Sequence, residues 1–111
     1  MKSFIRESII IIYMEDHGIF NKEGKFIIFK HSPICPLSAS AKEEVKKYLN
    51  EKDHLNIIEI DVINEAELKM KIAEVYEVRH ESPQILLIND QKCVDDFDHQ
   101  DISLKRLKEL K

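Results

Sequence analysis

One stretch decides the fold: Phe26-Ile-Ile-Phe-Lys-His-Ser-Pro-Ile-Cys35-Pro-Leu-Ser38. It begins as an apolar run typical of a buried strand and ends in a cysteine that a proline follows. Proline is favoured at the first position of a helix, where its missing N–H needs no partner, so Pro36 predicts a helix with Cys35 as its N-cap. A sulfur at that place faces unpaired backbone N–H groups and the positive end of the helix dipole, which favour the thiolate. The stretch therefore predicts a cysteine suited to redox or nucleophilic chemistry.

Length and composition describe an ordinary globular domain. The chain has 111 residues, enough for one modest core, and we expect a single domain over residues 1–111. Its hydrophobic fraction of 43% and charged fraction of 34% are those of a soluble protein. A net charge of −4 without clustered Lys and Arg argues against nucleic acid as a partner.

The N-terminus does not predict a targeting segment. The isoleucine run at residues 9–12 is too short for a signal peptide and lacks a small-residue cleavage site. No stretch approaches the length of a membrane span, so we expect a cytoplasmic protein with no membrane partner. In that reducing compartment, Cys35 and Cys93 are expected to be reactive or buried rather than disulfide-bonded.

Hydrophobic periodicity predicts strands that alternate with helices. Residues 4–14 fit a strand or a helix, and the helix is favoured because Gly18 offers a C-cap. Strands are predicted at residues 25–29, 56–62, 85–88 and 93–97. Helices are predicted at residues 36–50, at residues 64–76 and from Ser103 onward.

Each predicted helix carries an apolar stripe that should face the core. In the first, the stripe is Leu37, Ala41, Val45 and Leu49. In the second, Asn64 and Glu67 form a capping box, and the stripe is Leu68, Ile72 and Val75. The last is capped by Ser103 and carries Leu104, Leu107 and Leu110.

The order of elements predicts the sheet. Strands that a helix separates are expected to be parallel, whereas the last two, joined by a short loop at residues 89–92, can only be antiparallel. The fold class is therefore α/β, with a mixed four-stranded sheet flanked by helices in three layers.

A cysteine opens the helix after the first strand, and Pro83 directly precedes the hairpin. Together with the segment at residues 72–78, this order resembles the thioredoxin and glutaredoxin superfamily, in which a cis-proline lies beside the active cysteine. The resemblance extends from Phe26 onward. It implies a thioredoxin-like domain in which a cis bond precedes Pro83 and the backbone of Ser82 pairs with substrate.

Four segments taken together carry a narrower likeness: Phe29-Lys-His-Ser32, Cys35-Pro-Leu-Ser38, His80-Glu-Ser-Pro-Gln84, and His99 with Ile102-Ser103. They resemble the monothiol bacilliredoxins of the bacillithiol system, the YtxJ-type family. The resemblance implies that Cys35 accepts bacillithiol, a low-molecular-weight thiol, from mixed disulfides on S-thiolated client proteins. Bacillithiol is then a co-substrate, and no cofactor is expected to be tightly bound.

Ser38 stands where dithiol members of the fold carry the second cysteine of Cys-x-x-Cys. A hydroxyl cannot attack a disulfide, so Cys35 alone can only exchange one partner for another and needs a second small thiol to regenerate it. Two roles stay open for Ser38 itself. Its hydroxyl can satisfy the backbone of the first helical turn, or it can donate to the Cys35 sulfur.

Four basic residues flank the predicted site: Lys30, His31, Arg79 and His80. Each alone fits a solvated loop. Together they would place positive charge at the rim of the site, where it would stabilise the Cys35 thiolate and meet the carboxylates of small thiols. We expect Lys30 and His31 to support Cys35, and Arg79 and His80 to bind substrate with Ser82 and Pro83.

Cys93 is not expected to act as a second redox thiol. The hairpin strand runs away from the active end at ~3.3 Å per residue, which puts its loop roughly 15–20 Å from Cys35, whereas a disulfide needs Cα atoms within about 7 Å. A zinc site is not expected either, because the spacing of His31 and Cys35 lacks a second pair of ligands.

Two other functions stay open. The first is an iron–sulfur cluster carrier, a role that some monothiol glutaredoxins have. Those proteins have glycine after the active cysteine, whereas Pro36 stiffens that turn here and disfavours a bound cluster. A redox-inert binding module would use only the fold, and alkylating Cys35 would then change nothing. The choice of bacillithiol over glutathione or coenzyme A follows from the resemblance alone.

Overall fold

The computed structural model describes residues 16–110, so the helix expected at residues 4–14 lies outside the described residues. Every strand and helix predicted within them is present. In chain order the elements are η1 (Ile19–Asn21), β1 (Lys25–His31), α2 (Pro36–Leu49), β2 (Ile57–Asp61), α3 (Ala66–Tyr76), β3 (Gln84–Asn89), β4 (Lys92–Asp98), η2 (His99–Asp101) and α4 (Leu104–Lys108).

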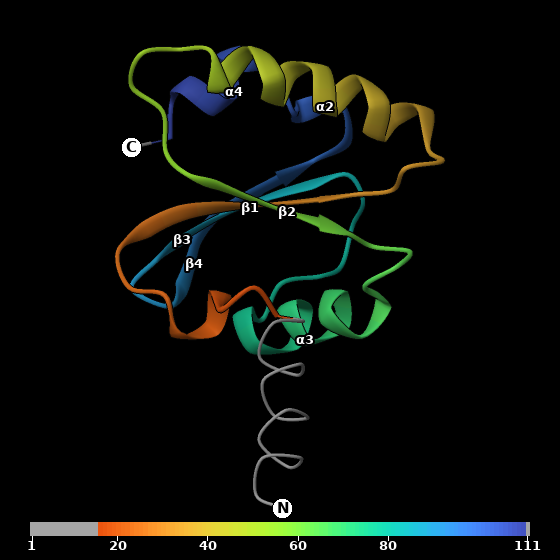
Figure 1. Ribbon diagram of the computed structural model, residues 1–111, viewed down its shortest axis with the longest axis vertical. Coiled ribbons are helices and arrows are strands. Elements are labelled where there is room, and N and C mark those ends of the chain that lie inside the picture. Colours follow the sequence, from red (N-terminus) through yellow and green to blue (C-terminus); the bar gives the residue numbers. More distant parts are fainter. Residues whose placement is uncertain (1–15, 111) are drawn as a thin grey trace, which may run out of the picture.

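The sheet has the strand order β2-β1-β3-β4, and helices cover both faces. Figure 1 shows three layers, with α2 and α4 above the sheet and α3 below it. β1 and β2 are parallel, and the β3–β4 hairpin is antiparallel, as predicted. The mixed four-stranded α/β fold is therefore confirmed.

The predicted direction of β3 is wrong. β3 is antiparallel to β1, with Gln84 opposite Lys30 and Asn89 opposite Lys25, although α3 separates β3 from the preceding strand. The reason is the segment at residues 77–83, which runs back from the end of α3 to the sheet edge where β1 ends (Figure 1). Two strands joined by a helix are parallel when the helix itself returns the chain to the starting end of the sheet. Here residues 77–83 carry the chain back to the opposite end, so β3 runs antiparallel to β1.

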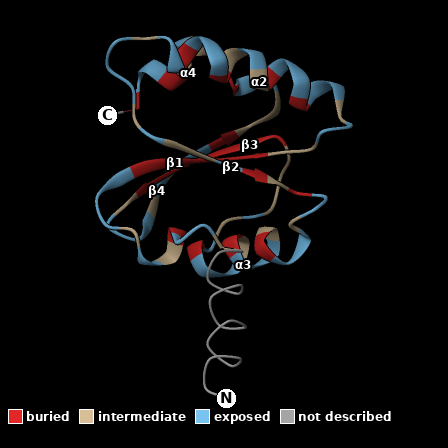
Figure 2. Cartoon of the chain, viewed as in Figure 1, coloured by how far each residue is buried: buried red, intermediate tan, exposed pale blue. Residues whose placement is uncertain are grey.

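Two apolar cores lie on opposite faces of the sheet. Alternate residues of β1 enter each: Ile27 and Phe29 face α2 and α4, whereas Phe26 and Ile28 face α3. Figure 2 shows the resulting band of buried residues along the central strands. A central strand covered on both sides reads as a continuous apolar run, which is why β1 could be recognised from sequence.

The inner face of α2 differs from the predicted stripe at both ends of the helix. The helix buries Ser38, Ala41, Val45 and Tyr48, whereas Leu37 and Leu49 are exposed. A spacing of four residues advances by about 40° per step on a helix of 3.6 residues per turn, so residues 37 and 49 cannot share a face. The Tyr48 ring fills the core, and its hydroxyl accepts a hydrogen bond from the Leu55 N–H at 2.8 Å.

The predicted start and face of α3 also need correction. The N-cap is Glu65, and its side chain makes no cap hydrogen bond, so the capping box is absent. The Asn64 amide instead donates to the Asp61 carboxylate at 2.8 Å. The buried residues are Leu68, Ile72 and Tyr76, with Val75 exposed.

The last helix follows the prediction at its start. The Ser103 side chain accepts a hydrogen bond from the Arg106 N–H at 3.1 Å, which confirms Ser103 as the N-cap of α4. Leu107 and Leu110 are buried, and Leu104 packs partly buried against the same core.

Candidate active site

Cys35 lies between the end of β1 and the first turn of α2. It is the N-cap of α2, with extended backbone angles (φ −98°, ψ 125°), and Pro36 takes the first helical position. Its carbonyl accepts the first helical hydrogen bond from Ala39 N–H at 3.1 Å, and its side chain is half-buried. The predicted N-cap position is confirmed.

Hydrogen bonds from the helix start lower the pKa of the Cys35 thiol. The Ser38 backbone N–H has the largest effect and outweighs burial, which raises the pKa; the Leu37 N–H and the Ser38 side chain lower it by smaller amounts. These donors stabilise a sulfur anion but have little to offer a neutral thiol. The site therefore favours the thiolate through the first turn of α2, without help from a basic side chain.

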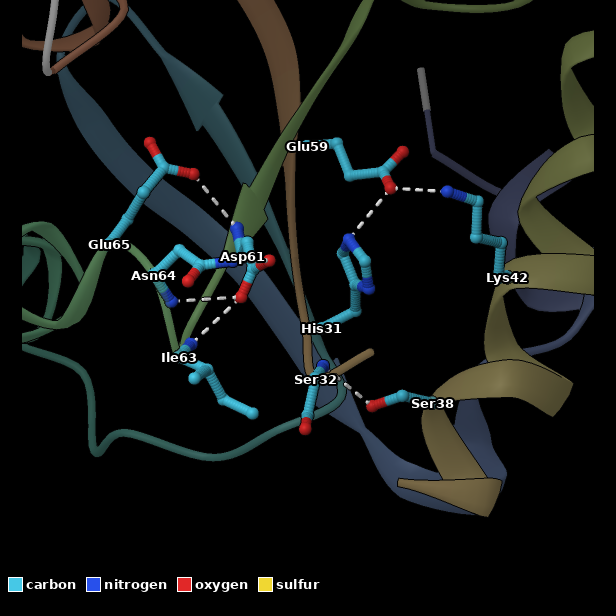
Figure 3. Close-up of polar contacts among 9 residues, drawn as sticks. All are labelled: His31, Ser32, Ser38, Lys42, Glu59, Asp61, Ile63, Asn64 and Glu65. Atoms are coloured by element: carbon cyan, nitrogen blue, oxygen red, sulfur yellow. Dashed lines mark hydrogen bonds and ion pairs between the residues drawn. The ribbon is translucent and has the colours of Figure 1, made fainter. Parts of the chain in front are cut away.

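The structure shows Ser38 in the first of the two roles that were open for it, as an acceptor for the backbone. The residue is buried, and its Oγ accepts a hydrogen bond from the Ser32 N–H at 3.0 Å (Figure 3). The Ser38 side chain also makes the smallest of the contributions that lower the pKa of the Cys35 thiol. A hydroxyl both accepts and donates, so the same side chain can hold the β1–α2 loop and favour the thiolate.

The segment before β3 contains the expected cis-proline. The Ser82–Pro83 peptide bond is cis, and Pro83 is buried. Gln84, the first residue of β3, pairs with Lys30 near the end of β1, which brings residues 82 and 83 to the sheet edge from which the Cys35 loop departs. The structure thus places Ser82, Pro83 and Cys35 at one edge of the sheet.

His31 is not a free positive charge at the rim. Its ring is largely buried, stacks on Phe29 and pairs through Nε2 with the Glu59 carboxylate at 2.7 Å. Figure 3 shows that Lys42 of α2 reaches the same carboxylate, at 2.6 Å. Glu59 of β2 therefore links β1 and α2 beside the site, and its carboxylate pairs with the Lys42 ammonium.

The expectation for Lys30 is wrong. Its side chain is wholly buried on the α3 face of the sheet, and its Nζ donates to Gln84 Oε1 at 2.8 Å. Strand alternation explains this, since Lys30 points the same way as Phe26 and Ile28. Lys30 thus presents no charge at the rim of the site.

Arg79 and His80 also depart from the expected positive rim. The Arg79 side chain is almost fully exposed, with its nearest carboxylate, on Glu81, at 3.5 Å. Burial lowers the pKa of His80, and the nearby cations Lys30 and Lys69 lower it further against an opposing effect of Glu81, so the neutral ring is favoured. Neither contributes to the lowered pKa of Cys35, and substrate binding by Arg79, His80, Ser82 and Pro83 stays a prediction.

Cys93 has the opposite character to Cys35. Burial raises its pKa to about 11, and its Sγ donates to the Asp95 carbonyl at 3.3 Å. It pairs with Ile88, which in turn lies opposite Phe26 at the start of β1, whereas Cys35 follows the end of that strand. Phe26 and the end of β1 at His31 are five residue steps apart, or roughly 16 Å, so Cys93 lies far from Cys35. Cys93 is a partly buried strand residue, as predicted.

Sequence reasoning did not identify the exposed apolar residues of the Cys35 loop and of the loop beside it. Ile34 is 81% exposed directly before Cys35, and Leu37 and Ile63 are also exposed. A hydrogen bond from Val62 N–H to the His31 carbonyl brings the loop of Ile63 beside the β1–α2 loop, and Figure 3 shows Ile63 next to Ser32. Large apolar side chains are expected to be buried, so nothing in the sequence indicates that these three are exposed. Only the geometry of the two loops shows that they form an exposed apolar surface.

Residues 16–110 contain no cluster of metal ligands and no helix able to span a membrane. No three His, Cys, Asp or Glu side chains of this region gather as a metal site requires. Within the same region, no helix has the length and hydropathy needed to span a bilayer.

The family is decided by a match over most of the chain. Residues 14–107 match the family described as monothiol bacilliredoxin BrxC. The chain belongs to the monothiol bacilliredoxins. The match includes both sides of the site, the Cys35 loop and the segment before β3.

Solved structures place this bacilliredoxin in the thioredoxin fold. A candidate oxidoreductase with a thioredoxin fold is 31% identical, with a TM-score of 0.76 over 89% of this chain and 87% of that chain. Fasciola hepatica thioredoxin is 22% identical over 86% of each chain, with a TM-score of 0.63. Reduced desulfothioredoxin from Desulfovibrio vulgaris Hildenborough is 20% identical over 78% of each chain, with a TM-score of 0.60. Family and fold together assign the bacilliredoxin to the thioredoxin-fold thiol oxidoreductases.

Proposed function

We propose that this protein removes bacillithiol from S-bacillithiolated client proteins by accepting it on Cys35. The observation that carries the proposal is a single stabilised thiolate at the start of α2, with a serine in the place of a resolving cysteine. Membership of the monothiol bacilliredoxins supports bacillithiol as the small thiol. The clients are S-thiolated proteins, and bacillithiol is a co-substrate rather than a bound cofactor.

The reaction takes place in two exchanges. The Cys35 thiolate attacks the bacillithiol sulfur of the client's mixed disulfide; a new S–S bond forms on Cys35, and the client sulfur leaves as a thiolate that takes a proton from water. A free bacillithiol thiolate then attacks the bacillithiol held on Cys35. Bacillithiol disulfide leaves, and the Cys35 thiolate is restored with no other oxidant or reductant consumed.

The surroundings of Cys35 support an exchange with a protein client. Ile34, directly before Cys35, and Ile63, in the loop that is hydrogen-bonded to the end of β1, are exposed and would offer apolar contact to a client. The Ser82 backbone at the cis-proline, at the same edge of the sheet, would pair with the client's main chain. The leaving client thiolate needs no acid from the protein, because thiols ionise near neutral pH.

Intact mass spectrometry tests the choice of small thiol. The protein is exposed in parallel to bacillithiol disulfide, glutathione disulfide and coenzyme A disulfide, and then to an S-bacillithiolated test protein. We expect one bacillithiol adduct on Cys35, transfer from the test protein to Cys35, and no adduct on the Cys35→Ser variant. A preferred adduct with glutathione or coenzyme A would reassign the small thiol, and an inert Cys35 would refute the exchange mechanism.

A further inference from the structure

Lys30 and Gln84 form a polar pair inside an apolar core. They lie directly opposite each other on β1 and β3, with exposed fractions of 0% and 1%. The Lys30 ammonium donates to Gln84 Oε1 at 2.8 Å, and no carboxylate among residues 16–110 forms an ion pair with it. A fully buried lysine that faces a neutral amide is rare, since buried charges are normally paired.

The Gln84 side chain fastens the segment that leads to the cis-proline. Its Oε1 also accepts a hydrogen bond from the Glu81 N–H at 3.3 Å, and its Nε2 donates to the Arg79 carbonyl at 3.1 Å. Lysine has no acceptor, so Lys30 requires the amide oxygen to face it and thereby turns the amide nitrogen toward Arg79. One side chain, held in one orientation by Lys30, thus restrains residues 79 and 81, immediately before Ser82.

Fold stability does not account for Lys30. Burial lowers its pKa to about 8, and Lys69 adds to the effect, so the amine carries its charge at neutral pH at a cost to the folded state. An apolar residue of similar shape at such a position commonly stabilises a protein. Residues that cost stability and yet build a defined polar network are typical of functional sites.

We propose that Lys30 and Gln84 are positioning residues for the exchange reaction, holding residues 79–82 where the client's main chain pairs with Ser82. This inference rests on the proposed function, because it concerns how the client is presented to Cys35. The two residues do not touch the reacting sulfur atoms. They act through the hydrogen bonds from Lys30 to Gln84 and from Gln84 to the backbone of residues 79 and 81.

The test uses Lys30→Met, Gln84→Met and the double variant. A single change leaves a buried polar group short of a partner, whereas the double change replaces both with apolar groups, which is often neutral for stability. We expect the double variant to unfold at the parent's urea midpoint or above and to react with iodoacetamide within twofold of the parent. Its exchange with an S-bacillithiolated test protein should be at least tenfold slower, and hydrogen exchange at the Glu81 amide should be at least tenfold faster.

A matched control and a second readout separate the outcomes. Lys69→Met removes a nearby positive charge that takes no part in the hydrogen bonds to Gln84, so its client exchange should stay within twofold of the parent. A double variant that exchanges with the client at the parent's rate would overturn the proposal, as would unchanged protection of the Glu81 amide. A parent that exchanges with no bacillithiolated protein would refute the proposed function instead, and the Glu81 readout would still test the role of Lys30 and Gln84.

Discussion

Replacing Lys30 by methionine removes a pH-dependent cost of burying its charge, so the free energy of unfolding should shift in the variant's favour most at neutral pH and progressively less as the pH rises. The loss of a partner for the Gln84 amide oxygen is a separate cost that is the same at every pH. The pKa of this buried amine is lowered from 10.5 to about 8, so between those values the folded protein binds fewer protons than the unfolded chain. The cost of the buried charge is therefore complete below pH 8 and disappears above about pH 10.5. At about 1.4 kcal/mol per pH unit, that cost is about 3 kcal/mol at pH 7 and falls to about 1.4 kcal/mol at pH 9.5.

Urea unfolding of the parent and Lys30→Met at pH 7 and pH 9.5 measures this effect. The variant's advantage in unfolding free energy should be about 2 kcal/mol larger at pH 7 than at pH 9.5. Tyr76 and Cys93, with pKa values of about 12 and about 11, occur in both proteins, so their titration cancels in the difference. A difference that does not change with pH would show that the Lys30 amine is not held in the low-dielectric core, and the argument from its burial would fail.

Other predictions concern the two cysteines and Ser38. Ser38→Ala removes a hydrogen bond that lowers the pKa of Cys35, so the pKa should rise in a thiolate absorbance titration at 240 nm; an unchanged pKa would show that the hydroxyl does not reach the sulfur. Ser38→Cys should form an internal disulfide with Cys35, detected as the loss of two free thiols, because a side chain at this buried position faces Cys35; a variant that stays reduced would contradict that orientation. Cys93→Ser should leave client exchange within a factor of about two, because Cys93 lies at the far end of the sheet. A stalled adduct on Cys35 in that variant would make Cys93 a resolving thiol.

Much of the fold follows from local signals. The apolar run of β1 and the proline after Cys35 each have one physical reading, and the structure confirms both. The direction of β3 had no such signal, because it depends on the path of residues 77–83 rather than on the type of any residue. The inner face of α2 was misjudged because a four-residue spacing looks regular in sequence but turns around the helix.

The candidate site likewise has features that the sequence predicted and features that it did not. The lowered pKa of Cys35 follows from helix geometry that Pro36 already indicates. The basic residues were misplaced because charge suggested exposure, whereas the two-residue alternation of β1 puts Lys30 on the α3 side with Ile28. A polar Gln84 at the start of an otherwise apolar strand was the available sign of a buried partner for Lys30.

Because residue 38 is serine rather than cysteine, the proposed reaction depends on the concentration of free small thiol. A dithiol site carries its own second thiol beside the first, so its release step is intramolecular and does not depend on free thiol. In the reaction proposed for this protein, the release step is bimolecular, and its rate would rise in proportion to the concentration of free small thiol. When that thiol is scarce, each molecule would retain its adduct and stop after one turnover. The fraction of loaded protein would then report the free thiol remaining, and the copy number of the protein would set how many adducts it can hold.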